Sequence, residues 1–287
     1  MKKILVPTDF SDLSEMTLKY AVKIADKINA EIYLVHFMDH PLGRRFSTSS
    51  YGDESHQGEE QLFTIQLVRK YHTTLGGLAS SYSHAKGEIH YEVFNQDFDG
   101  GVETYVEEKQ IDLIIMGTTG EETLEEFFTG NHTEQVIERV SCPIISIKEN
   151  PHNINSDLIV LGIDLKKDEN DNYAKAVAYL NDLSSGLGTT IEVVHVADAG
   201  IGDHSVLEAE VKKMADNYGL LNYNISVTEN NDKERGLMAF ALAKGAGLLA
   251  VLTHSEGGFF RVFSHSTSEE LTKESDIPVL TINLHNV

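Results

Sequence analysis

The chain contains 287 residues, which is too long for one small domain and suits two domains of roughly 140 residues each. Hydrophobic residues make up 41% of the sequence and there are only 5 Pro residues, a composition that excludes a disordered or collagen-like chain. Asp and Glu total 45 against 23 Lys and Arg, and the resulting net charge of −22 argues against nucleic acid or an anionic membrane surface as a partner.

Short apolar runs and helical spacing predict the same series of elements twice along the chain. In the first half, the apolar runs predict strands at residues 3–9, 30–36, 89–94, 112–117 and 142–147, and the spacing of apolar residues predicts helices around 18–28, 102–106 and 136–140. In the second half, strands are predicted at 157–164, 190–195, 225–228, 248–253 and 277–282, and helices around 174–180, 207–215 and 237–243. The internal repeat therefore covers both halves of the chain.

Each half reads β-α-β-α-β-α-β-α-β, which predicts an α/β fold. Right-handed crossovers turn this order into a doubly wound, open parallel sheet with helices on both faces, as in Rossmann-like folds. We predict two tandem domains, 1–149 and 157–287, joined by a polar linker at 148–156. The first half is the longer one, and we predict that residues 41–60, rich in Gly, Ser and His, form a long loop in it.

The last predicted strand of each half is apolar, and an uncovered apolar edge strand invites aggregation. We therefore expect strands 144–147 and 279–282 to pair with each other, which would join the two domains into an internal pseudo-dimer. The alternative is that helices alone cover these edges. Further assembly into a homo-oligomer stays open.

The chain shows no signal of export or of membrane insertion. Its first nine residues lack the apolar core of a signal peptide, and no window approaches the roughly 20 apolar residues of a membrane span. The single cysteine, Cys142, cannot form an intramolecular disulfide, which suits a reducing compartment. We expect a cytoplasmic protein with no membrane partner, and a small buried thiol at Cys142 rather than a nucleophile.

The stretch 117–134 carries the most informative motif, because Gly117 follows a predicted strand and Gly130 precedes a predicted helix. Ligands of doubly wound sheets bind beyond the carboxyl ends of the strands. Glycine lets a ligand approach the main chain, and the free N–H groups of a helix start can hold phosphate without a lysine. A divalent cation such as Mg²⁺ would offset the repulsion between a polyphosphate and this acidic chain. Turn formation and helix capping would explain the same glycines without a ligand.

Three features together resemble the universal stress protein family in its tandem form, over nearly the whole chain. They are the Val6-Pro7-Thr8-Asp9 segment, the Gly-x2-Gly-x9-Gly spacing, and the final strand that begins with Pro143. The resemblance implies an adenine-nucleotide alpha-hydrolase-like fold and a stress-response protein that binds ATP. Carried over to this sequence, it implies a binding site for the adenine nucleotide made of Pro7, Thr8, Asp9, Val35, Met116, Gly117, Gly120, Gly130, Asn131 and Thr133.

Two departures from the family pattern bear on this expectation. Asn131 stands where ATP-binding members have Ser or Thr, and its amide can either donate to a phosphate or cap the following helix. In the second copy, His265 stands where Gly130 stands in the first, and a side chain there would obstruct a close ligand. We therefore expect a degenerate second domain, with Asp164 as the remnant of its site.

Three functions remain open at this stage. The first is a regulatory module that binds ATP with little or no turnover, the second is a slow ATP hydrolase, and the third is a partner-binding protein without a nucleotide. The sequence contains neither a Walker loop nor a nucleophile elbow, so we assign no catalytic residue. It has no zinc-ligand pattern either, and we expect His36 and His195 to be strand ends hydrogen-bonded to nearby backbone.

Overall fold

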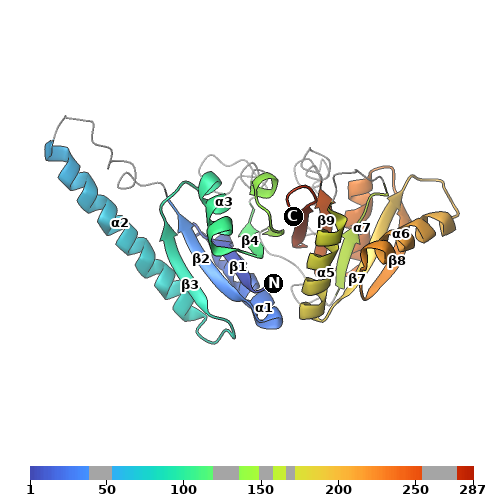
Figure 1. Ribbon diagram of the computed structural model, residues 1–287, viewed down its shortest axis with the longest axis horizontal. Helices are drawn as coiled ribbons and strands as arrows, with labels where there is room; N and C mark the ends of the chain where they lie inside the picture. Colours follow the sequence, from blue (N-terminus) through green and yellow to red (C-terminus); the bar gives the residue numbers. More distant parts are fainter. Residues whose placement is uncertain (39–53, 119–135, 149–157, 166–171, 254–276) are drawn as a thin grey trace.

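The computed structural model describes residues 1–38, 54–118, 136–148, 158–165, 172–253 and 277–287, and it forms one mostly parallel sheet with helices on both faces (Figure 1). The elements of the first half are β1 (Lys3–Pro7), α1 (Asp12–Ile28), β2 (Glu31–Phe37), α2 (Glu54–Ser81), β3 (Ile89–Phe94), α3 (Phe98–Lys109), β4 (Leu113–Gly117) and β5 (Ile144–Ile147). Those of the second half are β6 (Leu158–Gly162), α5 (Tyr173–Leu187), β7 (Thr190–Ala197), α6 (Ser205–Tyr218), β8 (Tyr223–Glu229), α7 (Lys233–Lys244), β9 (Leu248–Thr253) and β10 (Val279–Asn283).

The strand order is the same in both halves of the sheet. The order β3-β2-β1-β4-β5 continues directly into β10-β9-β6-β7-β8. Every strand pair within a half is parallel, and each half reverses its strand order once, between β1 and β4 in the first and between β6 and β9 in the second. The predicted α/β fold with a doubly wound, mostly parallel sheet is therefore confirmed.

The two last strands pair with each other, as their apolar sequences predicted. Strand β10 lies antiparallel to β5, with Leu280 opposite Ile145, and we call this pairing the seam. It removes two edges that would otherwise present apolar side chains and unpaired backbone groups to water. The sheet consequently runs without interruption from β3 to β8.

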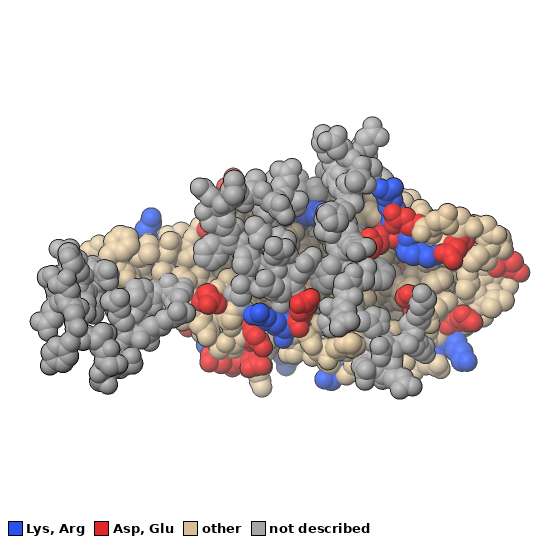
Figure 2. All heavy atoms as spheres, turned by 90° about the horizontal axis from the view of Figure 1, so that it is seen from above, with Lys and Arg blue, Asp and Glu red and all other residues tan. Residues whose placement is uncertain are grey.

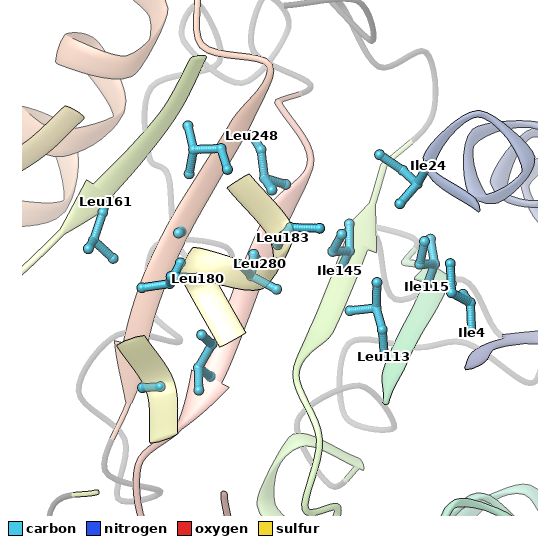
Figure 3. Packing of buried hydrophobic residues seen from close by; sticks show 14 of the residues in the cluster. Ile4, Ile24, Leu113, Ile115, Ile145, Leu161, Leu180, Leu183, Leu248 and Leu280 are labelled. Atoms are coloured by element: carbon cyan, nitrogen blue, oxygen red, sulfur yellow. The ribbon is translucent and has the colours of Figure 1, made fainter. Parts of the chain in front are cut away.

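The alternation of side chains along each strand divides the core into three clusters. On one face, a single cluster crosses the seam and joins Ile4, Leu113 and Ile145 of the first half to Leu180 and Leu280 of the second (Figure 3). On the other face, the two halves have separate clusters, one against α3 and one against α7. Burial on the first face is thus shared between the halves.

Helices α1 and α5 lie on this shared face and contact each other across the seam. A Cβ atom at Gly186 of α5 would stand 2.8 Å from the Ile28 Cγ2 atom of α1, so the absence of a side chain allows the close contact. On the other face, Asn283 of β10 donates from Nδ2 to the Ile137 carbonyl at 3.1 Å, and Asn286 donates to the Glu138 carbonyl at 2.6 Å. These amides supply hydrogen-bond donors to two carbonyl groups of the helical turn 136–139, because the last carbonyls of a helix have no partner within the helix.

The predicted loop at 41–60 is wrong over its last part, because α2 begins at Glu54. The helix runs along the outer side of the first half and extends beyond the sheet (Figure 1). Leu62 and Phe63 within it are 62% and 66% exposed, so this part of the helix buries no continuous apolar face. Apolar periodicity was the signal for helices, and such a helix does not carry that signal. Residues 41–53 lie outside the described part.

Within the described part of the chain, no helix is both long enough and apolar enough to cross a membrane. On the face shown in Figure 2, acidic and basic side chains of the described residues lie next to one another. The linker predicted at 148–156 lies almost wholly outside the described residues.

Candidate functional site

The candidate site lies where the strand order of the first half reverses, because ligands of open α/β sheets bind at such a point. Strand β1 ends there at Pro7 and is followed by Thr8 and Asp9, while the neighbouring β4 ends at Gly117 and is followed by Thr118. We call the residues that directly follow β1 and β4 the exits of these strands. Hydrogen bonds hold both exits in place: Thr8 N donates to the Val35 carbonyl at 2.9 Å, and Thr118 N donates to the Ile147 carbonyl at 2.8 Å. The structure thus brings together the sequence-predicted residues at the ends of β1 and β4.

Asp9 holds the turn that leads into α1. Its Oδ1 atom accepts from Ser11 N at 3.0 Å and from Ser11 Oγ at 2.6 Å. Ser11 is in turn the N-cap of α1, and its Oγ atom accepts from Ser14 N at 3.2 Å. Within the described part of the chain, the Oδ2 atom of Asp9 forms no hydrogen bond, so one carboxylate oxygen anchors the turn and the other is available to a ligand.

Phe10 has a backbone conformation that bulky residues rarely adopt, with φ at 68°. Its N–H donates to Thr8 Oγ1 at 3.1 Å, and its ring packs against two other rings. The ring centroid lies 4.7 Å from that of His36 and 5.3 Å from that of Tyr71 in α2, which is nearly parallel to it. Sequence reasoning missed Phe10 and Tyr71, because the left-handed backbone and the 61-residue separation leave no local pattern.

The expectation for His36 and His195 is confirmed, since each hydrogen-bonds the backbone just past the neighbouring strand. The Nδ1 atom of His36 lies 2.8 Å from the Thr8 carbonyl oxygen, and that of His195 lies 3.2 Å from the Ile163 carbonyl oxygen. Thr8 follows the end of β1 directly, as Ile163 follows the end of β6. The same contact therefore recurs at equivalent strand ends of the two halves.

Burial lowers the pKa of His36 below its ordinary value of 6.5, although the bond to the Thr8 carbonyl and the charge of Asp9 both act to raise it. The folded state therefore binds a proton less readily than the unfolded chain. The contribution of neutral His36 to stability is present above pH 6.5 and is lost as the pH falls through the lowered pKa.

We expect wild-type protein to lose unfolding free energy more steeply than His36→Asn as the pH is lowered from about 7.5 to about 5. Urea unfolding at each pH gives both curves, and their difference isolates His36 from the other titrating groups. Parallel curves would contradict the lowered pKa.

The side chains of Val35 and Met116 belong to the hydrophobic core. Both are 0% exposed and pack in the cluster that faces α3. Pro7 is buried as well, at the end of β1. These three predicted binding residues can meet a ligand only through main-chain atoms, and the Val35 carbonyl already accepts the Thr8 N–H.

Gly117 is required by the packing of α1. A Cβ atom at this position would stand 2.6 Å from the Cγ atom of Leu13 and 3.1 Å from the Oγ1 atom of Thr17. Cβ contacts as short as the first distance are essentially never seen, so a side chain here would force the Leu13 side chain or the start of α1 to move. The packing of α1 against β4 accounts for this glycine without a ligand.

The other predicted residues of the glycine stretch, Gly120, Gly130, Asn131 and Thr133, lie outside the described part of the chain, as do His265 and Ser266 of the second copy. Asp164 lies two residues after the end of β6, at the reversal point of the second half.

Cys142 is 5% exposed, and burial raises the pKa of its thiol, which confirms the expected small buried residue. Within the described residues, no three His, Cys, Asp or Glu side chains gather in the manner of a metal site.

Comparisons with known proteins place this geometry in a context. Residues 1–148 match the model of the universal stress protein family. Two relatives come from Methanocaldococcus jannaschii. The universal stress protein MJ0531 is 30% identical over 148 residues, which cover 52% of this chain and 82% of that protein. The universal stress protein MJ0577 is 26% identical over 153 residues, which cover 51% of this chain and 94% of that protein. The crystal structure of a universal stress protein from Archaeoglobus fulgidus shares the fold over 98% of this chain and 96% of its own, with a TM-score of 0.62 at 16% identity.

Proposed function

Because the chain belongs to the universal stress protein family, we propose that its first half binds ATP or a related adenine nucleotide with little or no turnover. One observation carries this proposal. The stretch with Gly-x2-Gly-x9-Gly spacing leaves the sheet at the end of β4, next to the Thr8-Asp9 exit of β1, at the point where the strand order reverses. A crevice at this point is where doubly wound folds hold nucleotides.

The proposed roles follow from the chemistry of each residue. Main-chain N–H groups of the stretch 117–131 would hold the phosphates at the start of the following helix, where the helix dipole favours an anion. Thr8 and Asp9 would contact the nucleoside, Asp9 through its Oδ2 atom. A Mg²⁺ ion bound with the nucleotide would supply charge neutralisation, and an Asp carboxylate is a ligand of the type that this ion prefers.

Little turnover is proposed because Asp9 and His36, the titratable groups that the structure describes beside these strand ends, already hydrogen-bond to the neighbouring turn or backbone. Asp9 Oδ1 is bonded twice to Ser11, and His36 Nδ1 donates to the Thr8 carbonyl. A general base must reach the proton that it abstracts, and His36 is only 7% exposed. A regulatory binding module in the response to stress fits this arrangement better than a hydrolase does.

We further propose that domains 1–149 and 157–287 form an internal pseudo-dimer, supported by the repeated strand order and by the antiparallel pairing of β5 with β10. The second domain would be a degenerate partner in this unit, since the sequence lacks the glycine spacing there. A cytoplasmic location is part of the same proposal.

Gly130→Val tests the nucleotide proposal. A side chain at this position would obstruct the main chain that is proposed to hold phosphate, so MgATP should no longer raise the melting temperature of this variant. Wild-type protein at 100-fold excess over Kd should gain about 2.7 kcal/mol. Gly258→Val in the second copy is the matched control and should respond to MgATP as wild-type protein does.

The nucleotide released from denatured wild-type protein distinguishes the alternatives. Co-purified ATP supports a binding module, whereas ADP together with measurable turnover supports a slow hydrolase. No nucleotide and no MgATP-induced stabilisation would contradict the proposal and favour a partner-binding protein, a function to which Asn131 and the changed second copy point. Normal ATP binding by Gly130→Val would show that the phosphate is held elsewhere.

A further inference from the structure

Phe10 stands out among the described residues by the conformation of its backbone. Besides the glycines, four described residues have a positive φ, and Phe10 is the one that is not an Asn or a Gln. Asn29 and Gln110 are the C-caps of α1 and α3, where this conformation is common, and Asn222 directly precedes β8. For a bulky residue the left-handed conformation is unfavourable, because the Cβ atom comes too close to the following carbonyl oxygen. Other contacts therefore have to hold Phe10 in place.

Three rings from separate segments of the chain pack together at this point, and we call them the aromatic cluster. The Phe10 ring centroid lies 4.7 Å from that of His36 in β2 and 5.3 Å from that of Tyr71 in α2, and the centroids of His36 and Tyr71 lie 4.4 Å apart. The planes of the Phe10 and Tyr71 rings are only 12° apart. Ring pairs of this kind stabilise a fold beyond the area that they bury. The contacts of its ring thus support Phe10 from two sides.

The packing of α2 fixes the position of Tyr71. This helix packs against β2 and β3. Leu75, one turn after Tyr71 and on the same side of the helix, is 0% exposed and belongs to the core cluster that both halves share. Tyr71 itself is half-buried. A helix far along the chain consequently supplies a ring that supports the exit of β1.

The second half keeps the histidine contact but not the left-handed aromatic residue. His195 hydrogen-bonds the Ile163 carbonyl, as its counterpart does in the first half. Two residues after Ile163, in the place of Phe10, stands Leu165, and its φ is not positive. The exit of such a strand therefore folds without an aromatic cluster. The cluster belongs to the half whose sequence carries the Gly-x2-Gly-x9-Gly spacing.

We propose that Tyr71 is a positioning residue of the nucleotide site, which it serves by holding Phe10 in the left-handed conformation. The inference rests on the proposed function, in which Asp9 contacts the nucleoside. Asp9 directly precedes Phe10, and its Oδ1 atom bonds Ser11, which directly follows Phe10. A change of φ at Phe10 therefore breaks this turn and redirects the Asp9 carboxylate. The apparent affinity for the nucleotide then falls with the fraction of molecules in which the turn is formed.

Variants at position 71 test the contribution of the ring. Tyr71→Ala should weaken the binding of MgATP to the full-length protein, measured by calorimetry, by at least about threefold. Tyr71→Phe keeps the ring and should bind MgATP like wild-type protein. The matched control is Tyr91→Ala, because the Tyr91 ring is 40% exposed and contacts His72 of the same helix at 5.0 Å without touching Phe10. This control should also bind like wild-type protein.

Two substitutions of Phe10 separate the backbone from the ring. Both Phe10→Ala and Phe10→Gly remove the ring, but only glycine adopts the left-handed conformation without a steric cost. We therefore expect Phe10→Gly to bind MgATP at least about threefold more tightly than Phe10→Ala. Adding Tyr71→Ala to Phe10→Gly should not change the affinity further. A merely structural role of the ring would give the glycine variant no advantage.

A measurement on nucleotide-free protein keeps this proposal distinct from the proposed function. A strong NOE between the N–H and Hα protons of residue 10 marks a positive φ, and it should be present in wild-type protein and Tyr71→Phe but weakened in Tyr71→Ala. Circular dichroism confirms that each variant is folded. Failure of wild-type protein to bind MgATP would contradict the proposed function, and the NOE would still decide whether Tyr71 holds the turn. An unchanged NOE or unchanged MgATP affinity in Tyr71→Ala, or equal affinities of Phe10→Ala and Phe10→Gly, would overturn the role of Tyr71.

Discussion

Leu280→Ala should lower the unfolding free energy of the chain by about 3–5 kcal/mol. Leu280 is 0% exposed, lies opposite Ile145 in the seam, and belongs to the cluster that both halves share. Truncation removes buried methyl groups and leaves a cavity that the surrounding strands fill only partly. Because one cluster spans the seam, the loss should affect the unfolding of both halves.

Urea unfolding followed by circular dichroism and by Tyr fluorescence measures this loss, and the fluorescence comes from Tyr because the sequence contains no Trp. The matched control is Leu221→Ala, since Leu221 is 63% exposed and its truncation should change the unfolding free energy by no more than about 0.5 kcal/mol. Equal losses of unfolding free energy in the two variants would contradict a stabilising role of the seam.

Gly117→Ala should destabilise the protein by about 1–3 kcal/mol in the absence of any nucleotide. The added methyl group would stand 2.6 Å from the Leu13 Cγ atom, and Leu13 is itself buried, so its side chain or the start of α1 has to move within a packed environment. Thermal and urea unfolding of the nucleotide-free protein measure the effect. A glycine kept only for a ligand would tolerate the substitution without loss of stability.

A double-mutant cycle with Leu13→Ala identifies the cause of the Gly117→Ala effect. Once Leu13 is truncated, the added methyl group meets no Cγ atom, so the cost of Gly117→Ala should fall by at least about 1 kcal/mol. Gly77→Ala is the control for the glycine substitution itself. A Cβ atom at Gly77 would have no other atom within 4 Å, and Ala there should stabilise α2 by about 0.5–1 kcal/mol. Additive effects of Gly117→Ala and Leu13→Ala would contradict the packing explanation.

Of the candidate site, sequence reasoning located the exits of β1 and β4 but not what the residues there do. It assigned Val35, Met116 and Gly117 to the ligand. The side chains of Val35 and Met116 pack in the core, and the lack of a side chain at Gly117 is explained by the packing of α1. It did not reveal the contact of Phe10 with His36 and Tyr71, because stacking of rings from three separate elements leaves no periodic signal. The long helix α2 was partly read as loop because its sequence shows no regular apolar stripe, and Leu62 and Phe63 within it are exposed.

The sequence by itself determined the class of fold, the positions of the strands and the similarity of the two halves. Strands buried on both faces must be apolar throughout, so β1, β4, β6 and β9 are visible as apolar runs whatever lies beside them. Only the tertiary structure decided the register of the seam, the reason for Gly117, and the contacts of Phe10 with His36 and Tyr71. Each of these depends on distances between residues far apart along the chain, which are set when the sheet closes over its helices and not by any local preference of the backbone.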